Sequence, residues 1–94
     1  MTSVLGNVMT HVRLVSRMAR ATGTDLVGAY RAGDLTQEAW VDMVQACRGC
    51  SWAGACGDWL EAHEYADRAP TECPNRGRFL DLQALAALRM PEEA

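Results

Sequence analysis

The sequence contains no lysine, and all nine of its basic residues are arginines. Without lysine, the chain has neither the amine that forms Schiff bases nor the lysine of a phosphate-binding loop, so two large classes of enzyme chemistry lack the residue on which they usually depend. No apolar run approaches the roughly 20 residues of a membrane span. Asn7, His11 and Arg13 interrupt the N-terminal segment where a signal peptide needs an unbroken apolar stretch. We therefore expect a cytoplasmic protein that does not associate with membranes.

Basic charge is also scarce relative to acidic charge. Nine arginines against twelve acidic residues give a net charge of −3, whereas proteins that bind nucleic acid present a basic surface. We expect no nucleic-acid binding. With 94 residues, of which 49% are hydrophobic and 22% charged, the chain has the composition of one globular domain over residues 1–94. A chain this short buries only about 60 to 65% of its unfolded surface, so a bound metal would contribute much to its stability.

Helical spacing of apolar residues recurs along the chain, and no segment alternates as a strand does. We therefore predict an all-α fold, a compact single-domain bundle of four or five short helices. The first expected helix runs from about Ser3 to Ala21, and the second contains Leu26, Val27 and Tyr30 and ends at Gly33. The third begins with a capping box at Asp34 and Gln37 and runs to about Ala46. After a loop over residues 48–54, the fourth contains Cys56, Trp59, Leu60 and His63, and the last runs from Cys73-Pro74-Asn75 to about Arg89.

Two of these helices have well-marked apolar stripes that we expect to face the core. The stripes consist of Leu5, Val8, Val12, Val15 and Ala19 on the first helix and of Phe79, Leu82, Leu85 and Leu88 on the last. Arg13, Arg17 and Arg20 lie opposite the first stripe and indicate a solvated face. His11 is expected to be a partly buried packing residue.

Four cysteines, with the spacing Cys47-x2-Cys50-x5-Cys56-x16-Cys73, are the most informative feature. Stable disulfides are rare in a reducing compartment, so four thiols there call for another explanation. Three of them lie within ten residues around one helix-loop-helix corner, and the fourth comes from a later loop. Helix N-termini near Cys56 and Cys73 would place free N–H groups beside a thiolate or sulfide. We therefore predict a site within residues 47–75 at which all four sulfurs meet.

The spacing favours an iron–sulfur cluster over zinc. Structural zinc is typically held by two short chelating pairs, and only one Cys-x2-Cys pair is present here. A cubane offers four separate iron corners, which one pair and two distant single cysteines can surround. Trp52 and Trp59 flank Cys56 and either exclude water from such a cluster or simply fill a small core. His63 lies too far along its helix from Cys56 to share a single zinc, so we expect it near the ligands or in the core.

Two interpretations need no metal. Cys47 and Cys50 can form a reversible disulfide, and any of the four cysteines can be a small buried packing residue.

Short stretches of the sequence resemble known families. Residues 47–56 resemble the last three cysteines of the cluster loop in DNA glycosylases of the endonuclease III type, and Cys73-Pro74 resembles the end of bacterial ferredoxin runs. The first cysteine of the glycosylase pattern is absent and the chain is small and acidic, so no repair activity follows. A broader resemblance, over about residues 24–82, is to the small bacterial proteins grouped as domain of unknown function 6455. The residues that carry it are Arg31-Ala32-Gly33-Asp34-Leu35, Cys47-Arg48-Gly49-Cys50, Cys56, Trp59-Leu60, Pro70, Cys73-Pro74-Asn75 and Phe79. The resemblance implies a shared cysteine site on a small helical fold.

No catalytic triad, phosphate loop or metal-binding histidine pair is present, so we do not expect an enzyme. The leading hypothesis is a small accessory protein that holds a [4Fe-4S] cluster through Cys47, Cys50, Cys56 and Cys73, for electron transfer or redox response with an unidentified protein partner. A zinc-stabilised protein-interaction module is the alternative. A thiol/disulfide redox protein without a cofactor is the second alternative.

Overall fold

The computed structural model describes residues 7–89, and the part it describes is built from five α-helices without a strand. The helices are α1 (Val8–Ala21), α2 (Leu26–Ala32), α3 (Gln37–Arg48), α4 (Ala53–Ala62) and α5 (Arg76–Arg89). The predicted all-α class is confirmed.

Side-chain caps fix where the first three helices begin. A side-chain oxygen of Asn7, Asp25 or Thr36 accepts a hydrogen bond from the N–H three residues further on, at 2.9 to 3.0 Å. Such a bond satisfies one of the N–H groups that lack a partner inside the helix. The predicted start at Ser3 lies outside the described residues, and the extended backbone of Asn7 places the first turn of α1 at Val8.

The predicted capping box at Asp34 is wrong. Thr36 caps α3, because its hydroxyl lies 3.0 Å from the N–H of Ala39. The Asp34 carboxylate forms an ion pair with Arg89 instead, which ties the start of α3 to the end of α5. Gly33, whose φ of 84° is left-handed, ends α2 and turns the chain toward that cap.

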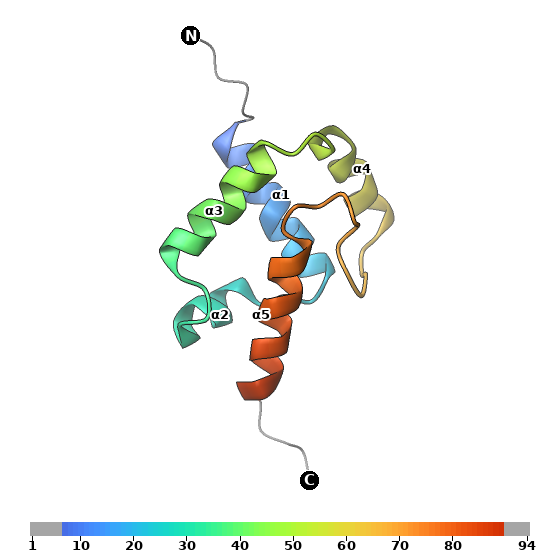
Figure 1. Cartoon of the computed structure of the whole chain (residues 1–94). Coiled ribbons are helices and arrows are strands. Elements are labelled where there is room, and N and C mark those ends of the chain that lie inside the picture. The colour runs from blue at the N-terminus through green and yellow to red at the C-terminus, as the bar shows by residue number, and fades with distance from the viewer. Residues whose placement is uncertain (1–6, 90–94) are drawn as a thin grey trace.

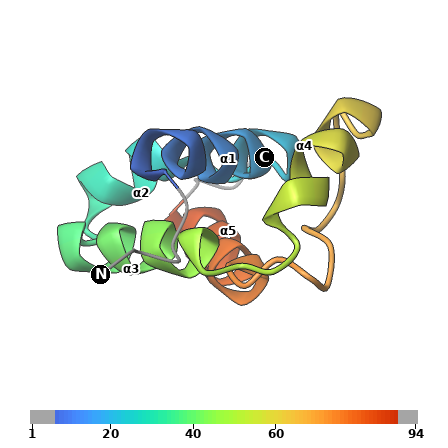
Figure 2. The ribbon, with the colours of Figure 1, turned by 90° about the horizontal axis from the view of Figure 1, so that it is seen from above.

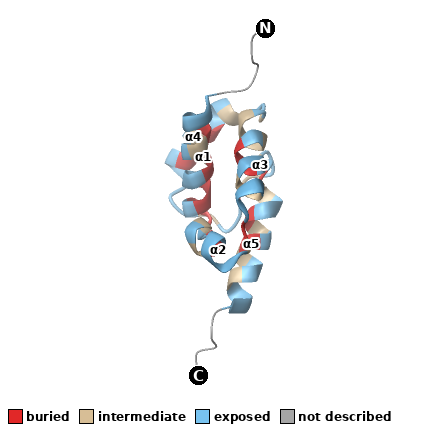
Figure 3. Cartoon of the chain, turned by 90° about the vertical axis from the view of Figure 1, so that its left-hand side faces the viewer, coloured by how far each residue is buried: buried red, intermediate tan, exposed pale blue. Residues whose placement is uncertain are grey.

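The helices form two layers, with α1, α2 and α4 on one side and α3 and α5 on the other (Figures 1 and 2). α1 packs against α3 and α4, and α2 packs against α5. Buried residues lie on the facing sides of the two layers (Figure 3). The most deeply buried large side chains are Met18, Met43 and Phe79, one from each of α1, α3 and α5.

Parts of the predicted stripes lie outside this core. Val15 and Ala19 are buried, and so is His11, as expected. Val8, however, is 46% exposed, and Leu5 lies outside the described residues. On α5, Phe79 and Leu82 are buried, whereas Leu85 and Leu88 are 40% and 82% exposed. The prediction for these two leucines is wrong because the last turns of α5 extend past the other layer (Figure 1).

The chain between α4 and α5 has no helix, and hydrogen bonds attach it to the rest of the fold. The Ala66 N–H donates to the Ala21 carbonyl oxygen at 2.8 Å. The Arg76 Nε donates to the Ala69 carbonyl oxygen at 2.9 Å, and the Asn75 side-chain amide donates to the Met43 carbonyl oxygen at the same distance. These bonds bring the end of the segment back to α3.

Between residues 7 and 89, no helix combines the length and the apolar character that crossing a membrane requires.

Candidate functional site

The four cysteines come from three places in the fold. Cys47 lies in the last turn of α3, and Cys50 lies in the short turn that follows it. Cys56 is in the first half of α4, which begins at Ala53, so the predicted loop ends earlier than expected and Gly54 is helical. Cys73 precedes α5 by three residues. All four are free thiols; Cys56 is buried and the other three are half-buried.

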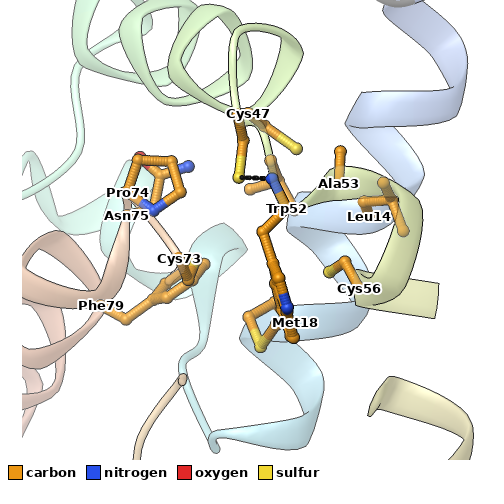
Figure 4. Close-up of a pocket in the computed structure, with 12 residues that line it drawn as sticks. Leu14, Met18, Cys47, Trp52, Ala53, Cys56, Cys73, Pro74, Asn75 and Phe79 are labelled. Atoms are coloured by element: carbon orange, nitrogen blue, oxygen red, sulfur yellow. Dashed lines mark hydrogen bonds between the residues drawn. The ribbon is translucent and has the colours of Figure 1, made fainter. Parts of the chain in front are cut away.

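One small cavity between α1, α3, α4 and the start of α5 has all four cysteines in its wall. Its volume is about 20 Å³, little more than one water-sized sphere. The other lining residues are mainly apolar, and Figure 4 shows most of them: Leu14, Val15, Met18, Trp52, Ala53, Pro74, Asn75 and Phe79. The structure thus brings together the four predicted site residues and surrounds them with an apolar shell.

Backbone N–H groups reach two of the four sulfurs. The Trp52 N–H donates to Cys50 Sγ at 3.4 Å, the dashed line in Figure 4. The backbone N–H groups of Asn75 and Arg76 act to lower the pKa of Cys73, and the Arg76 N–H also donates to the Cys73 carbonyl oxygen at 3.1 Å. The Cys50 thiol itself donates to the Glu72 carbonyl oxygen at 3.8 Å, so the two loops that carry Cys50 and Cys73 touch. The expectation of N–H donors is therefore met at Cys73. At Cys56 the nearby N–H groups have other partners: those of Ala55 and Cys56 donate to the Trp52 carbonyl oxygen, and that of Ala53 donates to the Cys50 carbonyl oxygen.

The electrostatics of the site favour protonated thiols in the metal-free chain. Burial, and then the neighbouring thiols, raise the pKa of Cys47 to about 12 and that of Cys56 to about 11. The pKa of Cys73 is raised too, mainly by burial. Each thiolate would be desolvated and repelled by its neighbours, so a cation is needed to balance several of them at once.

The four sulfurs share a cavity without converging on one point. Within residues 7–89, no set of three or more His, Cys, Asp or Glu side chains is arranged to hold a single metal ion. Zinc needs each sulfur at about 2.3 Å from one centre, whereas a cubane binds each sulfur at a separate iron. Four thiols match either a four-iron cluster or a zinc ion in number and type.

The two tryptophans that flank Cys56 divide between the two interpretations, and both pack against the hydrophobic core. Trp52 lines the cavity, as the water-excluding interpretation requires, but Trp59 does not. The Trp59 ring stacks on His63, with ring centroids 4.2 Å apart, and His63 Nδ1 lies 2.8 Å from the Trp59 carbonyl oxygen. His63 is exposed at the end of α4, so the expectation that it lies near the ligands or in the core is wrong. The imidazole of His63 has the Trp59 carbonyl oxygen, near the C-terminal end of α4, as a hydrogen-bond partner, so it needs no partner in the core.

Sequence reasoning missed two residues of the site. Asn75 is 5% exposed and ties the Cys73 turn to α3, and Phe79 forms part of the cavity wall from α5. The position of Asn75 directly after Cys73-Pro74 was a signal, because an asparagine in a turn next to a ligand commonly bonds backbone groups.

The comparisons with known proteins support the expected relationship. Neither a curated protein nor a solved structure matches the chain. The family of unknown function DUF6455 matches residues 2–85, a range that includes the four cysteines. The chain therefore belongs to the DUF6455 family.

Proposed function

We propose that the protein is a small accessory protein that holds a [4Fe-4S] cluster through Cys47, Cys50, Cys56 and Cys73, for electron transfer or redox response. One observation carries the proposal: four free thiols from the end of α3, the following turn, α4 and the loop before α5 line a single apolar cavity. A cluster would supply a one-electron centre there. The chain's own groups would bind it, exclude water and direct N–H groups at two of the sulfurs.

Hydrogen bonds to sulfur are one of the ways in which a protein sets the potential of a cluster. The N–H groups of Trp52, Asn75 and Arg76 are placed for that role. The apolar wall has the second effect of limiting solvent access, which also tunes the potential. With all four thiolates used as ligands, no position is left open for a substrate, so an accessory role is simpler than an enzymatic one.

The pKa of Cys47 argues against the redox-thiol alternative. Reactive cysteines have lowered pKa values, because the thiolate is the nucleophile. Here burial raises the pKa of Cys47 to about 12, so that thiol stays protonated at neutral pH. Zinc remains the alternative cofactor, with the sulfurs converging once the ion binds. We propose a cytoplasmic location and a protein partner, with no role in nucleic-acid binding.

The test is purification under anaerobic conditions from iron-supplied cells, followed by an absorption spectrum and metal analysis. The proposal requires a brown protein with broad visible absorption and about four irons per chain. A colourless protein with one zinc supports the interaction module instead. A protein with neither metal, in which Cys47 and Cys50 titrate reversibly as a disulfide, supports the redox pair.

Cysteine-to-serine variants locate the ligands. Cys56→Ser, at the buried ligand, is expected to lose most of its iron and its visible absorption. Ser51→Ala is a matched control, because Ser51 lies in the turn next to Cys50, is exposed and does not line the cavity. Equal iron content in Cys56→Ser, Ser51→Ala and the wild type would refute the proposed site.

A further inference from the structure

We infer that Asn75 is a positioning residue that holds Cys73, the one ligand distant in sequence, against the other three. The inference rests on the proposed function for its metal-bound consequence, but the contact itself belongs to the metal-free chain. Asn75 is buried, 5% exposed, and its side-chain Nδ2 donates to the Met43 carbonyl oxygen at 2.9 Å. This bond joins residues 32 positions apart.

The place of the bond on α3 makes it relevant to the site. Met43 precedes Cys47 by one helical turn, so both residues lie on the same face of α3. The Cys73-Pro74-Asn75 turn is therefore held beside the face that carries Cys47. Asn75 also lines the cavity, together with Cys73 and Pro74. One residue thus holds the turn through its side chain and lies in the wall of the cavity that the ligand shares.

The other three ligands do not depend on a contact of this kind. Cys47 and Cys56 lie inside helices, and the N–H of Cys50 bonds the Cys47 carbonyl oxygen at 3.1 Å. Cys73 lies outside any helix, at the end of the segment between residues 63 and 75. Loss of the Asn75 bond is therefore expected to release Cys73 selectively, leaving a site of three thiols.

The test compares Asn75→Ala and Asn75→Asp with Gln83→Ala in the full-length protein. Asp keeps the size of Asn but puts a charged acceptor in place of the N–H donor, whereas Ala removes the donor without adding a charge, so an effect shared by both variants comes from the lost bond. Gln83 is a matched control: its side-chain amide also joins distant parts of the fold, donating to the Thr22 carbonyl oxygen at 3.0 Å and to the Thr24 hydroxyl at 2.7 Å. Gln83 does not line the cysteine cavity.

The first readout is the rate of alkylation of each cysteine in the metal-free protein, followed by mass spectrometry, with circular dichroism as the check on helix content. Both Asn75 variants are expected to label Cys73 about two to thirteen times faster than the wild type, the factor that a lost hydrogen bond of ordinary strength gives. The labelling of Cys56 stays unchanged. The Gln83→Ala variant labels Cys73 at the wild-type rate.

The second readout is the iron content and the electron paramagnetic resonance spectrum of the cluster-loaded protein. Iron per chain falls from about four toward three in the Asn75 variants, with the electron paramagnetic resonance signal of an oxidised three-iron cluster. Equal labelling of Cys73 in the Asn75 variants and the wild type, or an equal rise in Gln83→Ala, overturns the inference. A wild-type protein without iron overturns the proposed function instead, and the labelling comparison still decides the role of Asn75.

Discussion

Phe79 connects the core to the cysteine cavity, so its replacement tests both. It is 1% exposed on α5, belongs to the main hydrophobic cluster and forms part of the cavity wall. Phe79→Ala removes the ring and leaves a void that the surrounding helices can fill only in part. Substitutions of this kind cost about 3 to 5 kcal/mol.

That cost is large for this chain. At roughly 0.05 to 0.15 kcal/mol per residue, 94 residues give a free energy of unfolding of about 5 to 14 kcal/mol, and small domains lie toward the lower end. The metal-free variant is therefore expected to be only marginally folded. A group that binds only the folded state adds about 4 kcal/mol when present at a thousand times its dissociation constant. Metal loading should therefore offset most of the loss.

The assay is urea unfolding followed by circular dichroism, on metal-free and metal-loaded protein. Leu88→Ala is the control on the same helix, because Leu88 is 82% exposed and its truncation should change the unfolding free energy by less than about 0.5 kcal/mol. A cost below about 1.5 kcal/mol for Phe79→Ala would refute the assigned burial. Equal stability of the variant with and without metal would show that Phe79→Ala no longer binds the metal, which would contradict the expected offset.

Three further predictions concern pH, fluorescence and one turn. Burial raises the pKa of Cys47 from 9.0 to about 12, so folding favours the protonated thiol. The free energy of unfolding of the metal-free protein should therefore fall as the pH rises above about 9. Cys47→Ala should reduce that fall, as measured by urea titrations at several pH values. Cluster loading should quench Trp52 emission, so Trp52→Phe should reduce the quenched fraction more than Trp40→Phe, whose ring does not line the cavity; equal reductions would contradict the geometry. Gly33→Ala should destabilise the fold by about 1 to 2 kcal/mol because its φ is 84°, whereas Gly54→Ala, in a helix with open space around it, should not destabilise it; thermal unfolding of both variants checks this.

Helical periodicity was sufficient to predict the fold class, because the apolar residues recur at helical spacing and no segment alternates as a strand does. Periodicity alone did not predict the residues at which the helices begin and end. Asp34 and Thr36 are both good caps by sequence, and the choice between them depended on Arg89, which pairs with Asp34 from the far end of the chain. The apolar pattern of α5 continues through Leu88, and only the length of the opposing layer decided that burial stops near Leu82.

The cysteine spacing by itself identified the candidate ligands, because residues 47, 50 and 56 are forced together by a single tight corner. Their meeting with Cys73 was decided by tertiary structure. Sixteen residues separate Cys56 from Cys73, and the part that follows α4 is brought back by hydrogen bonds such as that from Asn75 to the Met43 carbonyl oxygen. Local sequence determines what a segment can form on its own, whereas a contact between distant segments exists only once both are packed on the same core.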